Sequence, residues 1–188
     1  MRVIAGIARS VPLIAPQGLD TRPTTDKIKE TLFNMINFDL PDCVFVDLYS
    51  GSGAIGIEAI SRGARHAYFV EKNKKALECI KFNVVKCKFQ DEATIIARDV
   101  SDALYEIHDK ADIIFMDPPY DSMNEVNIMK QLLTSKIIHD DTIFIIEAAI
   151  ERDFSDIVSL GYEIYKEKFY KTNKHVFFRL ATNSEQSV

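Results

Sequence analysis

The chain has 188 residues, of which 47% are hydrophobic and 27% are charged, and its formal net charge at pH 7 is −5. This composition is close to the globular average and excludes gross disorder, while the apolar runs are too short for a membrane span. The negative charge argues against a protein that coats nucleic acid by bulk attraction. The charge is uneven, however: residues 1–30 and 160–180 are basic, and the residues between them are acidic. The start has no apolar signal segment, so we expect a cytoplasmic protein.

The first forty residues differ from the rest of the chain. They contain a short predicted hairpin, "RVIAGIARSVPLIAP", a turn at Gln17 and Gly18, and a helix that Thr25 or Asp26 can cap. Four apolar residues of this helix are spaced so that they share one face: Ile28, Leu32, Phe33 and Ile36. We expect residues 1–40 to form an extension packed on a main domain.

From Cys43 onward, apolar runs of strand length alternate with helix-like segments. Strands are predicted at "CVFVDLY", "HAYFVE", "ATIIAR", "ADIIFMD" and "TIFIIEA", with helices at 54–62, 73–86, 100–108, 124–134 and 153–159. This alternation predicts a doubly wound α/β fold with a mostly parallel sheet. The last runs, "GYEIYKEKFY" and "KHVFFRLA", are separated by "KTN", which predicts an antiparallel hairpin. We assign residues 41–182 to the main domain and expect 183–188 to fray.

The cysteines and histidines show no pattern typical of a disulfide framework or a metal site. Cys43, Cys79 and Cys87 are odd in number and have no C-x-x-C spacing, so we expect core thiols. The histidines are scattered singly, and we expect them to face solvent or to be bonded locally: His66, His108, His139 and His175. No metal site is predicted.

A glycine-rich loop follows the first strand of the predicted sheet. In "DLYSGSGAIGIEA", Gly51, Gly53 and Gly56 satisfy G-x-G-x-x-G between a strand and a helix, where glycines permit a tight turn and close approach of a ligand. Glu71 ends the second strand, where an acid can accept hydrogen bonds from two ribose hydroxyls. These features alone fit a dinucleotide as well as other adenosine cofactors.

Two further acids favour S-adenosylmethionine over a dinucleotide. Asp47 lies at the end of the first strand, where its charge would repel a pyrophosphate but suit the ammonium of a methionyl group. Asp99 follows the third strand and can accept from an adenine amino group. We therefore predict S-adenosylmethionine as the methyl donor and assign its binding to Asp47, Tyr49, Gly51, Ser52, Gly53, Glu71, Asp99 and Val100.

The fourth strand ends in "DPPY", although prolines can neither continue a strand nor donate hydrogen bonds to it. If the chain turns back after the third strand, Asp117, Pro118, Pro119 and Tyr120 face the glycine loop. Asp117 and the Pro118 carbonyl are acceptors that can hold an exocyclic base amine and aim its lone pair at the methyl group. The prolines keep the turn rigid, and Tyr120 offers a stacking face to an unstacked or flipped base. We predict these four residues to be catalytic.

The motifs resemble those of known enzymes. "DPPY" after a "DLYSGSGAIG" loop is similar to the amino-methyltransferases, which modify exocyclic base amines or, with Asn first, glutamine side chains. "RVIAG" and "TRPTTDKIKETLFNMI" closely resemble the N-terminus of the RsmD family, bacterial enzymes that methylate N2 of one guanine in small-subunit ribosomal RNA. The similarity runs from Arg2 to about Arg179.

The resemblance implies a seven-stranded class I S-adenosylmethionine-dependent methyltransferase that acts on a ribosomal subunit or an assembly intermediate, with no DNA or membrane partner. It also implies that Arg22, Thr24 and Thr25 lie near the cofactor and the path of the RNA, with Thr25 among the cofactor contacts. The family usually has a more basic hairpin where this chain has "IARSVPL", so the C-terminal hairpin, including Lys166 and Lys174, would share RNA binding. The candidate RNA-binding residues are Arg2, Arg9, Arg22, Lys168 and Lys171.

Other functions stay open at this point. The same chemistry could act on a DNA adenine or a protein glutamine, although 188 residues leave little room for a DNA-recognition domain and the motif begins with Asp117. The glycine loop also fits a dinucleotide-dependent oxidoreductase, which Asp47 and Asp117 disfavour, and a cofactor-binding module without catalysis.

Overall fold

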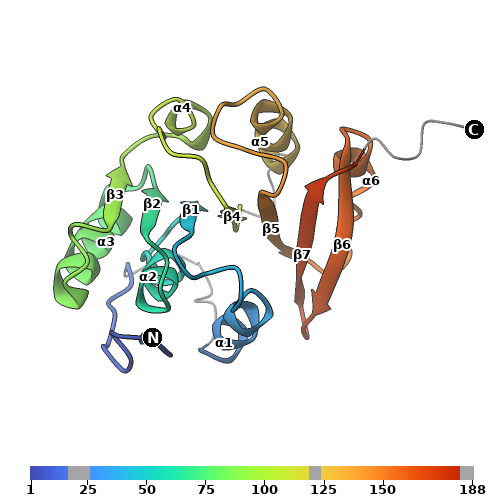
Figure 1. Ribbon diagram of the computed structural model, residues 1–188. Helices are drawn as coiled ribbons and strands as arrows, with labels where there is room; N and C mark the ends of the chain where they lie inside the picture. Colours follow the sequence, from blue (N-terminus) through green and yellow to red (C-terminus); the bar gives the residue numbers. More distant parts are fainter. Residues whose placement is uncertain (17–25, 119–123, 183–188) are drawn as a thin grey trace, which may run out of the picture.

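The computed structural model describes residues 1–16, 26–118 and 124–182 (Figure 1). The helices in these ranges are α1 (Asp26–Met35), α2 (Ala54–Ser61), α3 (Lys74–Cys87), α4 (Val100–Ala103), α5 (Asn124–Leu132) and α6 (Ser155–Val158). The strands are β1 (Val44–Leu48), β2 (His66–Val70), β3 (Ala93–Ile96), β4 (Ile113–Met116), β5 (Ile143–Ala149), β6 (Tyr162–Phe169) and β7 (Asn173–Leu180).

The strands of the described residues form one seven-stranded sheet in the order β3-β2-β1-β4-β5-β7-β6. The five strands from β3 to β5 pair in parallel, whereas β7 is antiparallel to both β5 and β6. The chain turns back after β3, so β4 lies beside β1, with Phe115 level with Asp47. The predicted doubly wound α/β fold with an antiparallel C-terminal pair is confirmed.

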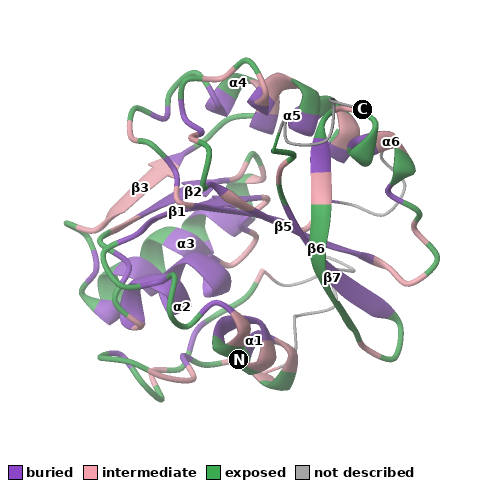
Figure 2. Ribbon diagram, turned by 45° about the vertical axis from the view of Figure 1, so that its right-hand side comes forward, coloured by how far each residue is buried: buried purple, intermediate pink, exposed green. Residues whose placement is uncertain are grey.

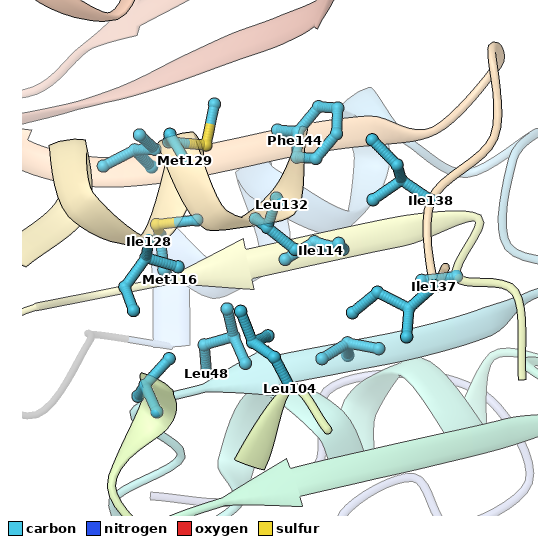
Figure 3. Packing of buried hydrophobic residues seen from close by; sticks show 14 of the residues in the cluster. Leu48, Leu104, Ile114, Met116, Ile128, Met129, Leu132, Ile137, Ile138 and Phe144 are labelled. Atoms are coloured by element: carbon cyan, nitrogen blue, oxygen red, sulfur yellow. The ribbon is translucent and has the colours of Figure 1, made fainter. Parts of the chain in front are cut away.

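Helices cover both faces of the sheet, which explains why the central strands are apolar along their whole length (Figures 1 and 2). On one face, Leu48 of β1 and Met116 of β4 belong to a core with Leu104 and with Ile128 of α5 (Figure 3). On the other face, α1, α2 and α3 pack against the odd-numbered side chains of β1 and β4, such as Phe45. The N-terminal segment adds Val3, Ala8 and Leu13 to this second core.

A buried carboxylate ties the N-terminal segment to α2. The side chain of Glu58 accepts hydrogen bonds from the N–H groups of Ile4 (2.8 Å) and Ala5 (3.0 Å). The Lys29 ammonium lies 3.1 Å from Oε2 of Glu58, and the Arg62 guanidinium lies 2.8 Å from Oε1. Because charged and backbone donors surround the carboxylate, its burial is compensated and the segment is fixed to the helix.

The burial of Lys29 is a departure from the predicted pattern of α1. We expected Ile28 to share the buried face, but Ile28 is only half-buried, whereas the Lys29 side chain is 1% exposed. Lys29 also donates from Nζ to the Arg2 carbonyl at 2.7 Å. Two acceptors inside the protein thus hold a cation that the hydrophobic pattern placed in solvent.

Two helices are at least three residues shorter than predicted. The helix expected at 100–108 ends at Ala103, because the N–H groups of Tyr105 and Glu106 bond to carbonyls three residues back and tighten the chain. The helix expected at 153–159 begins at Ser155, because the Asp153 carboxylate accepts hydrogen bonds from the Ser155 N–H and hydroxyl.

The predicted N-terminal hairpin is present only in a reduced form. One antiparallel bridge joins Arg2 and Pro12, and the N–H of Val3 donates to the Val11 carbonyl at 3.0 Å. Four other expectations are tested by the structure or concern residues outside the described ranges. The three cysteines are free and buried, as predicted. The turn at 17–18 and the tail at 183–188 lie outside the described residues. No helix within the described ranges has the length and apolarity to cross a membrane.

Candidate active site

A cavity of about 590 Å³ lies at the carboxyl ends of β1, β2, β3 and β4. Eight of the predicted site residues line it: Asp47, Tyr49, Gly51, Ser52, Glu71, Asp99, Val100 and Asp117. The order of the strands reverses between β1 and β4, and crevices at such a switch point are where doubly wound folds bind ligands.

The remaining predicted residues differ in how far they are described. Gly53 caps the N-terminus of α2, and Pro118 is buried next to Asp117. Thr25, Pro119 and Tyr120 lie outside the described residues, as do Arg22 and Thr24. The part of the site that the structure describes is therefore the donor side and the first half of the "DPPY" motif.

The glycine loop has the backbone conformation that its sequence predicts. Gly51 and Gly53 have φ angles of 53° and 77°, in the left-handed region that favours glycine. The Gly51 N–H donates to Oε2 of Glu71 at 2.9 Å, and Oε1 of Glu71 accepts from the N–H groups of Lys72 and Asn73. Oε2 accepts only one of these bonds, so Glu71 can both shape the loop and accept a hydrogen bond from a hydroxyl group of a ligand.

Asp47 is buried at the base of the cavity, with an exposed fraction of 1%. Its Oδ2 accepts a hydrogen bond from the Gly56 N–H at 3.2 Å. Burial raises the pKa of Asp47 to about 7, against the opposing effect of the Gly56 hydrogen bond. A cationic group bound in the cavity would favour the ionised form of this carboxyl.

Asp99 forms the opposite rim of the cavity. Its carboxylate accepts from the Lys72 ammonium at 2.8 Å and from the Ser101 N–H at 3.4 Å. The hydrogen bond from Lys72 is the main reason why the pKa of Asp99 is lowered. Lys72 itself lines the cavity and was not predicted as a site residue.

Asp117 follows β4 on the same face of the sheet as Phe115 and Asp47, because side chains two residues apart on a strand share a face. Burial, with the charges of Glu147 and Asp47 acting in the same direction, raises the pKa of Asp117 to about 8. Near neutral pH this carboxyl is therefore close to its change of protonation. The protonated form can donate a hydrogen bond, whereas the ionised form only accepts.

A buried polar network beside Asp117 was missed by the sequence analysis. Oε2 of Glu147 on β5 lies 2.9 Å from Nε2 of His175 on β7, and Nδ1 of His175 lies 3.0 Å from the Tyr170 hydroxyl. Asn173 donates to Oε1 of Glu147. The expectation that His175 faces solvent or is bonded locally holds only for its bond to Tyr170, because its side chain is fully buried and its carboxylate partner comes from another strand. A single acid inside the apolar run "TIFIIEA" is the one signal that could have indicated this network.

The N-terminal segment also contributes to the cavity. Met1, Ala15 and Pro16 line it. These three residues belong to no sequence motif that would mark them as site residues. Only their position in the folded chain makes them part of the site.

The candidate RNA-binding residues lie on two separate surfaces. Arg9, Lys168 and Lys171 are exposed, and Arg2 is exposed but pairs with Asp26 at 3.3 Å. Their role in RNA binding stays a prediction. Lys174 does not fit the expected role, because it is buried, with its ammonium 3.0 Å from Glu167 and near the rings of Phe154 and Phe169. In the described ranges, no group of three or more His, Cys, Asp or Glu side chains could hold a metal ion.

Comparison with known proteins identifies the family. The family model described as Conserved hypothetical protein 95 matches residues 1–179. The chain is 30% identical to Ribosomal RNA small subunit methyltransferase D of Haemophilus influenzae, over 97% of this chain and 94% of that protein. The chain belongs to the RsmD family. This RsmD family member is also 39% identical to the putative rRNA methyltransferase YlbH of Bacillus subtilis, over 71% of this chain and 72% of that protein.

A solved structure shares the architecture. The putative methyltransferase yhhF from Escherichia coli matches with a TM-score of 0.83 and 26% identity, over 97% of this chain and 99% of that chain. The sheet order and this likeness identify the class I S-adenosylmethionine-dependent methyltransferase fold. The RsmD family member described here is accordingly an S-adenosylmethionine-dependent methyltransferase, and the oxidoreductase alternative is set aside.

Proposed function

We propose that this protein transfers a methyl group from S-adenosylmethionine to the exocyclic N2 amine of a guanine in small-subunit ribosomal RNA. The observation that carries the proposal is the position of Asp117, whose carboxyl lies in the same cavity as the glycine loop and Asp47. The name of the H. influenzae relative, a ribosomal RNA small subunit methyltransferase, supports the choice of substrate.

The donor side of the proposed site follows from three acids. Glu71 would accept from ribose hydroxyls, Asp99 from the adenine amine, and Asp47 would face the methionyl ammonium. Tyr49, Ser52 and Val100 would complete the walls, and Thr25 is the predicted contact that lies outside the described residues. When bound, S-adenosylmethionine supplies an electrophilic methyl group on a positively charged sulfur.

The acceptor side would use the "DPPY" motif. The ionised Asp117 carboxylate and the Pro118 carbonyl would accept the two N–H bonds of the base amine, which turns its lone pair toward the methyl group. The amine loses one proton as it gains the methyl group, and Asp117 is the nearest proposed acceptor for that proton. Pro119 would keep the turn rigid and Tyr120 would stack on the flipped base.

We further propose that the substrate is a ribosomal subunit or an assembly intermediate in the cytoplasm. An acidic chain with a net charge of −5 would make few phosphate contacts, so its affinity for free RNA at physiological salt would be low. Ribosomal proteins would then supply part of the docking surface. In this proposal residues 1–40 form the extension, 41–182 the methyltransferase domain and 183–188 the tail.

The test is methyl transfer from labelled S-adenosylmethionine to small subunits from a strain that lacks this protein, followed by nucleoside analysis. Label in N2-methylguanosine supports the proposal, and label in another nucleoside or in protein contradicts it. Equal methylation of deproteinised RNA and of subunits would contradict the role of ribosomal proteins alone.

A further inference from the structure

A buried asparagine joins the N-terminal segment to the glycine loop. Asn83 lies on α3, and its side chain is 0% exposed. Its Nδ2 donates to the carbonyl oxygens of Ile14 and Ser52, each at 2.9 Å, and its Oδ1 accepts from the Ile14 N–H at 2.9 Å. Because the Ile14 N–H can only donate, the amide oxygen must face it, and this fixes the orientation of the side chain.

Both segments that Asn83 holds form walls of the donor cavity. Ser52 lines the cavity between Gly51 and Gly53, and Ile14 directly precedes Ala15 and Pro16, which line the cavity as well. Asn83 lies behind these walls, so it can act on a ligand only through them. A weaker link between the same segments is the 3.8 Å contact of the Ser52 hydroxyl with the sulfur of Met1.

Another buried anchor of the N-terminal segment, Ser61, does not reach the cavity. Ser61 of α2 accepts from the Ala8 N–H at 3.0 Å and donates to the Ala5 carbonyl at 2.6 Å. It therefore holds the segment on the same face of the sheet as Asn83 does, but through residues that do not line the cavity. Ser61 provides a matched comparison for Asn83.

We propose that Asn83 is a positioning residue for the methyl donor, which holds residues 14–16 and the Gly51–Gly53 loop at a fixed separation before S-adenosylmethionine binds. The inference rests on the proposed donor site but not on the identity of the acceptor. A pocket whose walls are already ordered binds its ligand without the cost of ordering them, so the effect of Asn83 falls on donor affinity. An aspartate at this position would keep the acceptor but turn its second oxygen toward two carbonyl oxygens, with loss of both donors.

The experiment compares Asn83→Asp with Ser61→Ala by calorimetric titration with S-adenosylmethionine and by steady-state kinetics. We expect both variants to have lower melting temperatures. Asn83→Asp should bind the donor about tenfold more weakly, because part of the cost of ordering the two segments then falls on binding. Its KM for the donor should rise while kcat at saturating donor stays within about threefold of the wild type. Equal donor dissociation constants in the two variants would overturn the proposal.

A second measurement needs no variant and is made on the unmodified protein. Hydrogen exchange with and without S-adenosylmethionine should show slower exchange at Ile14 and Ala15 together with the loop at 51–53. Slower exchange in the loop alone would overturn the coupling between the two walls. The calorimetric titration and the hydrogen exchange use no methyl acceptor, so a wrong acceptor assignment leaves their expected results unchanged. A wild type that fails to bind S-adenosylmethionine overturns the donor site and this inference together.

Discussion

Glu147 and His175 form a buried pair across two strands, with Oε2 of Glu147 2.9 Å from Nε2 of His175. They are partners in the antiparallel register of β5 and β7. In the parallel register of β4 and β5, Met116 pairs with Ile146, so the next residue along each chain brings Asp117 level with Glu147. The pair therefore lies beside the carboxyl that we propose as the amine acceptor.

This arrangement predicts the pH dependence of catalysis. The pKa of Asp117 is raised to about 8 by burial, Glu147 and Asp47, and the proposed role needs the ionised form. We expect kcat/KM to fall as pH decreases through about 8. Glu147→Gln removes one of the neighbouring charges, so the acid limb of the profile should move to lower pH.

The control for this profile is Glu78→Gln on the exposed side of α3. This variant removes the same charge at a residue that does not line the cavity and does not act on the pKa of Asp117, so its profile should match that of the wild type. A purely structural role of Glu147 would lower the activity at all pH values without moving the limb. An unshifted limb in Glu147→Gln would therefore contradict the electrostatic role.

Asp117→Asn should separate activity from stability. The variant loses the ionised acceptor, so we expect turnover to fall by about 10²–10⁴-fold while the donor dissociation constant changes only a few-fold. The folded-state pKa of Asp117 lies above its usual value of 3.8, so this carboxyl makes the fold less stable as pH rises toward 8. The melting temperature of Asp117→Asn at pH 8 should exceed that of the wild type by about 2–4 °C, and the difference should shrink at pH 5.

Calorimetry at both pH values measures this effect, with Asp102→Asn, a change at an exposed residue of α4, as the control. The Asp102 variant should show no gain that depends on pH in this way. If Asp117→Asn proved less stable than the wild type at pH 8, the buried carboxyl would have to be stabilising. If it kept wild-type turnover, the acceptor role would be wrong.

Gly56→Ala should damage the packing behind the glycine loop. A Cβ atom at Gly56 would lie 2.4 Å from Cε1 of Phe69, a contact that the surrounding core cannot relieve without moving the ring. We expect a loss of about 1–3 kcal/mol in the free energy of unfolding, measured with urea. In a Phe69→Leu background the same change should cost less, because the ring is absent. Equal losses in both backgrounds would show that the contact with Phe69 is not the cause.

Glu58→Leu tests the anchor of the N-terminal segment. The change leaves the Lys29 ammonium and the N–H groups of Ile4 and Ala5 without their buried acceptor. We expect the free energy of unfolding to fall by about 3–5 kcal/mol in urea titrations. The control Glu30→Leu removes an exposed carboxylate from α1 and should change stability by less than about 0.5 kcal/mol. A loss below about 1 kcal/mol for Glu58→Leu would mean that apolar packing alone holds the segment.

The sequence predicted the parts of the fold that local patterns encode. Apolar strands alternating with amphipathic helices indicated the sheet and its antiparallel end, because hydrophobic periodicity is set by each element alone. Asp47, Glu71, Asp99 and Asp117 could be placed at one edge because parallel strands of a doubly wound sheet end together. The glycine loop was recognisable because left-handed backbone turns require glycine.

Tertiary structure alone decided the partners of the buried polar groups. Lys29 and His175 look like surface residues in the sequence, but they are buried because Glu58 and Glu147 come from distant segments to receive them. Asn83 bonds to Ser52 and Ile14, which lie 31 and 69 positions away in the chain. No local periodicity of the sequence can encode such contacts. Such hydrogen bonds depend on which backbone groups the folded chain brings within about 3 Å, so they exist only once the sheet and its helices have packed.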